Sequence, residues 1–227
     1  MLRTAKLDIM VPRPYRGLHE GDHTLSSDTY DFAPVRAIAE QFRPYPRPWW
    51  IAGGWAVDLR VGHVTRHHDD LDVLILHRDL PTFREALGQL SAVVHEPASG
   101  KTWPWREDES IVPGRHALLI QANFAGIEKA HVLLAASDGE QWVNHRGGGR
   151  NRMPLKSVGL VRDGLPYLIP RLTLQFKWAT LRPQDDADFH SLLPFLDESD
   201  RALLAAGIRS LKPDHPWLPY LGLAKSS

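Results

Sequence analysis

The sequence predicts an α/β (α+β) fold, with a mixed central sheet flanked by helices and then a small C-terminal helical region. Two observations support this. Between residues 31 and 165, short apolar runs typical of strands alternate with stretches whose apolar residues recur at helical spacing. From Pro170 onward only helical spacing is found. We therefore expect an extended arm at residues 1–30, an α/β domain at 31–165 and a helical region at 166–227, with a soft boundary near residues 164–166.

Composition narrows the function classes. The chain has 227 residues, with 27 Lys and Arg against 27 Asp and Glu, so its formal net charge is zero and nothing favours long-range attraction to nucleic acid. It contains no cysteine, which excludes thiol catalysis and cysteine-based zinc sites. No apolar run approaches the roughly 18 residues of a membrane span, and the N-terminal residues show no secretory signal. We expect a cytoplasmic protein that binds neither membrane nor nucleic acid.

The elements of the α/β part follow from local patterns. Apolar runs predict strands at residues 49–52, 71–76, 91–96, 116–122 and 130–136. Helical spacing predicts helices at 34–42, 55–60 and 79–90, the last with Asp79 as its cap and Pro81 in its first turn. The segment 97–114 is rich in proline, tryptophan and acids, and is predicted to be a loop.

The C-terminal part is predicted to contain three helices. Pro170 suits a first helical turn, and the residues from there to about 181 are apolar on two sides, as in a buried helix. Two further helices are predicted at residues 185–196 and 199–211, separated by a turn at 197–198.

Two carboxylates stand at the start of a predicted strand. Asp70 and Asp72 are two residues apart, so their side chains are expected on one face of the sheet. Two adjacent carboxylates repel each other unless a cation lies between them, and oxygen ligands of this kind suit Mg²⁺, which also takes substrate phosphates. The alternative is a pair of solvated acids at a strand entrance.

A glycine pair precedes this strand. Gly53 and Gly54 follow a short strand and open a helix-like stretch. Glycines allow the backbone to approach a phosphate closely, and a helix N-terminus offers free N–H groups. A glycine pair alone is more typical of a tight strand-to-helix turn. Together with Asp70 and Asp72, however, it would place a phosphate cradle beside a metal site.

These residues resemble a known family. The pattern Gly-Gly-Trp-Ala-Val-Asp at residues 53–58, followed by Gly62, Thr65-Arg66, His68 and Asp70-Leu-Asp72, resembles the nucleotidyltransferase superfamily with a DNA polymerase β-like palm, and more closely the aminoglycoside 2″-adenylyltransferase-related family. Later segments, including Phe176-Lys177 and Arg182-Pro-Gln-Asp185, are similar to the family's later signatures. The likeness covers roughly residues 30–220.

The resemblance implies a function and a set of site residues. It implies Mg²⁺-dependent transfer of a nucleoside monophosphate, AMP from ATP or from another nucleoside triphosphate, to a hydroxyl of an aminoglycoside-like small molecule, as in antibiotic resistance. Asp70 and Asp72 would bind the metal. The residues expected to contact the nucleotide are Gly53, Gly54, Arg66, His68 and Lys177.

The sequence departs from the family at two positions. Where relatives carry a third acid on a neighbouring strand, this chain aligns His131, whose imidazole has an ordinary pKa near 6.5 and suits a general base. Gln184 replaces a basic residue of the later signature. Catalysis with His131 as the base is therefore one reading. A catalytically impaired nucleotide-binding or interaction module, or a transferase that modifies a protein partner, are the alternatives.

Other residues leave alternatives open. Lys177 could reach a triphosphate, or it could pair with Asp185, Asp186 or Asp188. Arg66 and His68 could contact phosphate or simply pack in their loop. The acidic segment 107–109, beside Trp103 and Trp105, could receive a cationic acceptor or form a solvated turn.

Overall fold

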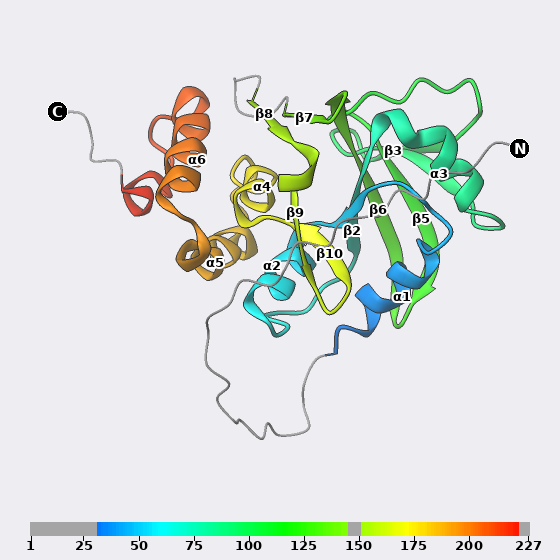
Figure 1. Cartoon of the computed structure of the whole chain (residues 1–227), viewed down its shortest axis with the longest axis horizontal. Helices are drawn as coiled ribbons and strands as arrows, with labels where there is room; N and C mark the ends of the chain where they lie inside the picture. The colour runs from blue at the N-terminus through cyan, green and yellow to red at the C-terminus, as the bar shows by residue number, and fades with distance from the viewer. Residues whose placement is uncertain (1–30, 145–150, 223–227) are drawn as a thin grey trace, which may run out of the picture.

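The computed structural model describes residues 31–144 and 151–222, so the predicted arm at residues 1–30 lies outside the described residues (Figure 1). In this part of the chain ten strands form one sheet, in the order β4-β3-β5-β6-β2-β1-β10-β9, with β7 paired to β6 and β8 to β7. The strands are β1 Trp49–Ile51, β2 Leu71–Leu76, β3 Ala92–Glu96, β4 Lys101–Pro104, β5 Ala117–Phe124, β6 Ile127–Asp138, β7 Gln141–Asn144, β8 Asn151–Pro154, β9 Gly159–Arg162 and β10 Leu165–Leu168.

The helices account for the remaining regular structure. They are α1 Ala33–Gln41, α2 Gly53–Val61, α3 Leu80–Ala86, α4 Pro170–Gln175, α5 Pro183–Leu192 and α6 Glu198–Leu211, with short 3₁₀ turns η1 His77–Asp79, η2 Leu155–Ser157, η3 Leu193–Phe195 and η4 Leu218–Leu221. The mixed α/β class with helices flanking the sheet is confirmed: β1 pairs antiparallel with β2, whereas β2 pairs parallel with β6. No helix in the described residues is long and apolar enough to cross a bilayer.

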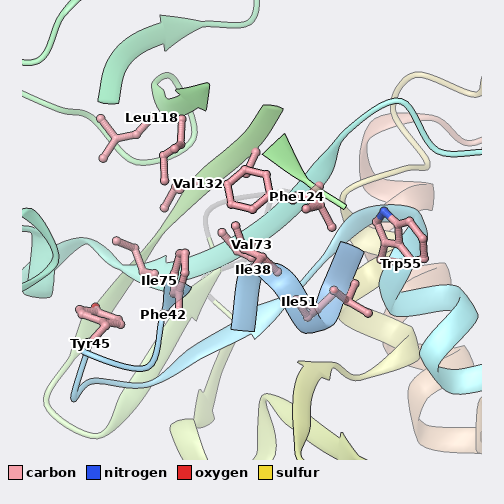
Figure 2. Close-up of a cluster of buried hydrophobic side chains, with 14 of the residues drawn as sticks. Ile38, Phe42, Tyr45, Ile51, Trp55, Val73, Ile75, Leu118, Phe124 and Val132 are labelled. Atoms are coloured by element: carbon pink, nitrogen blue, oxygen red, sulfur yellow. The ribbon is translucent and has the colours of Figure 1, made fainter. Parts of the chain in front are cut away.

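Strand alternation gives the sheet two different faces. Leu71, Val73 and Ile75 point to one face, where α1 and α3 cover them, and the resulting cluster is shown in Figure 2. The labelled members of that cluster are Ile38, Phe42, Tyr45, Ile51, Trp55, Val73, Ile75, Leu118, Phe124 and Val132. Asp72, together with Leu74 and Leu76, points to the opposite face. There the buried residues come from β1, β6, β7, β10 and α4.

A third cluster joins the helical region to α2. Val57 of α2 packs with apolar residues of α4, α5 and α6, and the rings of Phe189 and Trp217 stack with centroids 4.3 Å apart. Figure 1 shows α4, α5 and α6 gathered to one side, next to α2. The helix that follows the glycine pair is therefore held from both sides, which fixes the position of its N-terminus.

Several predicted elements need correction. The predicted loop at 97–114 contains β4, an edge strand whose last residue is Pro104, a position where a missing N–H is tolerated. The helix expected from residue 170 to about 181 ends at Gln175, and turns follow. The predicted helix at 79–90 is shorter, Leu80–Ala86. Strands β7 to β10 were not predicted. Because β10 belongs to the sheet, helical structure begins at Pro170, a few residues after the expected boundary.

Candidate active site

Two aspartates and a histidine meet on the open face of the sheet. Asp72 on β2 is the register partner of His131 on the parallel strand β6. The His131 Nδ1 atom lies 3.6 Å from Oδ1 of Asp72 and 3.7 Å from Oδ2 of Asp70. These three side chains are partly exposed, at 39% for Asp70, 27% for Asp72 and 23% for His131, so solvent or a ligand can reach them.

The carboxylates change the proton affinity of the imidazole. The pKa of His131 is raised above its ordinary value, chiefly by its interaction with Asp72, while burial opposes the shift and Asp70 adds to it. The positive charge of the imidazolium offsets the repulsion between the two carboxylates. A cation bound between the carboxylates would take over that role and release the imidazole to accept a proton.

The backbone of the glycine pair lies very close to the side chains of Asp72, Arg66 and His68. Gly53 begins α2 with a φ of +62°, and a Cβ atom placed there would lie 2.1 Å from Oδ2 of Asp72. A Cβ atom on Gly54 would lie 2.4 Å from the side chains of Arg66 and His68. A side chain at either position would collide with its neighbours. The sequence needs glycine here so that the first N–H groups of α2 can lie beside the Asp72 carboxylate.

The donor set fits a hard divalent cation completed by a substrate. Asp70 and Asp72 offer carboxylate oxygens on one side of the site, and such ligands suit Mg²⁺. Among the described residues no group of three His, Cys, Asp or Glu side chains is close enough to enclose a metal ion. A cation at Asp70 and Asp72 would therefore take its remaining ligands from water and phosphate oxygens.

A buried charge network lies between α2, the loop before β2 and α5. The Lys177 ammonium is 6% exposed and lies 2.7 Å from Asp188 and 3.5 Å from Asp185. Arg66 donates two hydrogen bonds to Asp188, at 3.1 and 3.3 Å. Of the alternatives left open for Lys177, the structure shows the pairing with buried acids.

His68, like Lys177, is paired with a buried acid. Its Nε2 atom lies 2.6 Å from Oδ2 of the fully buried Asp58, and Thr65 donates to the other carboxylate oxygen from both its backbone and its hydroxyl. The Trp55 indole lies over the His68 ring, with centroids 4.4 Å apart, and donates to the backbone oxygen of Asp70. His68 thus braces the segment that carries Asp70 and Asp72.

Arg182, in the helical region, is close enough for its charge to interact with Asp70 and Asp72, and sequence reasoning missed it. Its side chain is 56% exposed and donates to Asp185 at 2.9 and 3.1 Å. The pKa of Arg182 is raised mainly by that interaction, and Asp70 and Asp72 raise it further. Arg182 begins the Arg-Pro-Gln-Asp segment, so the later signature was the signal that could have identified it.

His95 is a second residue that the sequence did not reveal. Strand β5 separates β3 from β6 in the sheet, yet the rings of His95 and His131 stack with centroids 5.4 Å apart. The pKa of His95 is lowered by burial and by the neighbouring His131. Only the strand order places these two histidines together, and the sequence pattern does not state that order.

Two pockets flank the site. One, a partly open pocket of about 70 Å³, lies over β6 between the start of β5, β7 and the residue after α4. The other, about 580 Å³, lies between the start of α1 and the turn before β6. Its lining includes Trp55, Arg66 and Asp69 but none of Asp70, Asp72 and His131.

Known proteins match the part of the chain that carries the candidate site. The family model for aminoglycoside-2″-adenylyltransferase matches residues 34–106, the segment that carries the glycine pair and both aspartates. Curated 2″-aminoglycoside nucleotidyltransferases of Escherichia coli and Klebsiella pneumoniae are 50% identical over 48 residues, which is 21% of this chain. The match spans 23% of the length of those relatives.

Solved structures extend the likeness to most of the chain. The solution structure of the antibiotic-resistance factor ANT(2″)-Ia is similar with a TM-score of 0.51 and 16% identity, covering 78% of this chain and 90% of that one. The lincosamide antibiotic adenylyltransferase LnuA gives 0.50 and 15%, covering 73% and 98%. The family resemblance read from the sequence is thus confirmed for the segment with the glycine pair, and the chain has a nucleotidyltransferase fold.

Proposed function

We propose that this chain is a Mg²⁺-dependent nucleotidyltransferase that moves a nucleoside monophosphate, AMP from ATP, to a hydroxyl of a small molecule and releases pyrophosphate. The observation that carries the proposal is the placement of Asp70, Asp72 and His131 on one sheet face, directly beside the Gly53 turn. The confirmed family resemblance and the shared fold support it, and the relatives' names suggest an aminoglycoside-like or lincosamide-like acceptor.

The nucleotide side of the site lies at α2. The first N–H groups of α2 and the absence of a side chain at Gly53 allow a triphosphate to approach the backbone. Asp70 and Asp72 would hold Mg²⁺, which supplies charge neutralisation to the phosphates when bound. The exposed guanidinium of Arg182 faces the same carboxylates and would contact phosphate oxygens.

Arg66, His68 and Lys177 then act on the nucleotide indirectly. Their side chains are paired with Asp188, Asp58 and Asp185, within the network that fixes α5 and the loop before β2. We therefore assign these three residues to positioning: they hold Arg182 and the two aspartates in place for the nucleotide.

His131 is proposed as the general base. The acceptor oxygen would bond to the α-phosphorus as the bond between that phosphorus and the bridging oxygen to the β-phosphate breaks, and pyrophosphate would leave. His131 would take the proton of the acceptor hydroxyl at an imidazole nitrogen, beside the carboxylates. In the family the neighbouring strand carries an acid, and His131 occupies the register position opposite Asp72.

Nucleotide binding tests the proposal first. Calorimetric titration of non-hydrolysable ATP and GTP analogues, with and without Mg²⁺, should show Mg²⁺-dependent binding that is lost in Asp70→Asn/Asp72→Asn. Asp69→Asn is the matched control, because Asp69 is adjacent, 85% exposed and outside the carboxylate pair. Binding that ignores Mg²⁺, or persists in the double variant, would contradict the proposed site.

A second candidate function rests on His131 itself. With an imidazole in place of the third acid, the same face could bind a nucleotide without transferring it. Pyrophosphate release over a panel of hydroxyl acceptors separates the two functions. Mg²⁺-dependent nucleotide binding without release from any acceptor would favour the binding module, whereas release that depends on both Asp72 and an acceptor supports the enzyme.

A further inference from the structure

The smaller pocket continues the catalytic face along β6. Leu133 and Ala135 form part of its floor, and they alternate with His131, so the three side chains share one face of the strand. Two residues along a strand span about 7 Å. The pocket therefore begins one side-chain position beyond the proposed base on the same strand, and Leu134 and Ala136 line it as well.

The sheet order separates this pocket from the nucleotide side. The glycine pair follows β1, whereas the pocket lies over β5 and β6, and β2 with its two aspartates runs between them. His131 stands on the β6 side of Asp72. A triphosphate held at α2 and a group held in the pocket would thus approach the carboxylates from opposite sides, with His131 next to the pocket.

The lining is apolar and offers no acid. Apart from Arg115 and His116 it consists of proline, glycine and apolar residues, with Trp142, Val143 and Phe176 forming one wall. No Asp or Glu is among the described residues that line it. The volume of about 70 Å³ in this partly open pocket suits one small ring or branched chain. The pocket can therefore desolvate an apolar group, but it has no counter-charge for an ammonium.

The acids near the pocket are already engaged. Glu96 precedes the lining residue Pro97, and it accepts from Arg115 at 2.8 Å and from Ser99 at 2.6 Å. In the acidic segment 107–109, Glu109 accepts from the Trp103 indole, and Trp103 packs against the cluster on the opposite face of the sheet. The expected reception of a cationic acceptor by that segment therefore does not extend to this pocket.

We infer that the acceptor is an amphiphilic hydroxyl compound that places one ring-sized apolar group in the pocket over Leu133 and Ala135, rather than a polycation. The inference rests on the proposed function, because only a transferase has an acceptor. It narrows that function, because a polyamine would have to bring several charges next to apolar walls and to Arg115, whose own partner is Glu96.

Ligand binding to the whole protein tests the pocket separately from catalysis. The probes are 4-nitrophenyl β-D-glucoside, which is uncharged and carries an aromatic ring, glucose, which lacks the ring, and tobramycin, a polyamine. Titration with and without a non-hydrolysable ATP analogue and Mg²⁺ should give a Kd for the aryl glucoside about tenfold lower than for glucose, as expected for burying one apolar ring. Tobramycin should bind more weakly than the aryl glucoside.

Two variants locate the binding. Val143→Trp should fill the pocket and raise the Kd of the aryl glucoside about tenfold, with Val143→Thr as a control of similar volume. Analogue binding should be unchanged in both. His116→Asp adds an acid at the mouth and should improve tobramycin binding about fivefold, whereas the uncharged control His116→Asn should not. Thermal unfolding of each variant checks that it folds.

The outcomes separate the two claims. Tighter binding of tobramycin than of the aryl glucoside to the wild type, or equal binding of the aryl glucoside and glucose, would overturn the inferred acceptor class. Loss of nucleotide binding in Val143→Trp would instead assign the pocket to the nucleobase, which also overturns it. Absence of Mg²⁺-dependent nucleotide binding would contradict the proposed function, and the probe titrations without nucleotide would still decide the chemistry of the pocket.

Discussion

Gly53 shows how a single residue shapes the site. Replacing an α-hydrogen of Gly53 by a methyl group would place a Cβ atom 2.1 Å from an oxygen of Asp72. The backbone also has a φ of +62° at this residue, which disfavours any side chain. These are two separate costs. One acts on the stability of the fold through the backbone, and the other acts on the position of the Asp72 carboxylate.

A pair of alanine variants separates the two costs. Gly88 has nearly the same φ, +60°, and nothing lies within 4 Å of a Cβ atom there. Gly88→Ala should therefore lower the free energy of unfolding by about 1–2 kcal/mol from the backbone alone. Gly53→Ala should cost more in urea denaturation and should also abolish Mg²⁺-dependent nucleotide binding. Equal effects of both variants on both measurements would show that the approach to Asp72 is unimportant.

His131 is the residue that we propose as the general base. His131→Asn removes the base but keeps a polar side chain, so transfer should fall about 100-fold or more, while binding of the Mg²⁺–nucleotide complex persists. His131→Asp restores the acid of the family pattern and should recover part of the lost rate. Steady-state pyrophosphate release gives kcat, and calorimetry gives the nucleotide Kd. A rate unchanged in His131→Asn would remove His131 from the chemistry.

At the scale of elements, the buried charge network fixes α5 against the strand-bearing part. Lys177 neutralises Asp188 and Asp185, which are almost fully buried, so its loss leaves two carboxylates without that partner. Lys177→Ala should reduce the free energy of unfolding by about 3–5 kcal/mol. Arg43→Ala is the control, because the exposed pair of Arg43 with Glu40 should contribute at most about 1 kcal/mol. Urea denaturation measures both, and similar small losses would contradict the role of the network.

The sequence predicted the elements that carry strong local signals and missed those set by neighbours. The strand at 71–76 and the helices at 34–42 and 199–211 agree with the structure within about a residue, because each has a clear apolar period. Strands β4, β7, β8 and β9 are short and mostly polar or partly exposed, and pairing with other strands defines them. Strand β10 is buried but only four residues long, and its pairing with β1 and β9 defines it. After α4 the helix ends and the chain continues as turns, which place Lys177 beside Asp188.

The site residues divide in the same way, into those that local sequence predicts and those that only the fold brings together. The glycine pair and both aspartates are close in sequence, so the pattern predicted that they lie together. The resemblance added His131, because this residue aligns with the acid that the family carries on a neighbouring strand. Arg182 and His95 reach the site through the placement of α5 and through the strand order, which the sequence does not state. Lys177 was read as either a phosphate contact or an ion-pair partner. Its burial decides for the ion pair because an ammonium inside the protein needs a partner.

At the scale of the whole molecule, a buried carboxylate of the C-terminal helical region should make the stability of the fold depend on pH. Asp185 is fully buried. Burial opposes its ionisation, but hydrogen bonds from Arg182 and Thr180 and the charge of Lys177 outweigh this, so the pKa of Asp185 is lowered. A carboxyl group whose pKa is lower in the folded state stabilises the fold above its unfolded pKa, near 3.9. That contribution is lost as pH falls toward the folded value.

The wild type should therefore lose stability steeply just below pH 4, with Asp185 adding a slope of up to about 1.4 kcal/mol per pH unit. Urea denaturation at a series of pH values between 7 and 3 measures this. Asp185→Asn should be less stable at pH 7 and should decline less steeply below pH 4, because one proton uptake is missing. Asp214→Asn, at an exposed position after α6, should reproduce the wild-type profile. Parallel profiles for the wild type and Asp185→Asn would show that the contact between α5 and the turn after α4 does not depend on the charge of this carboxylate.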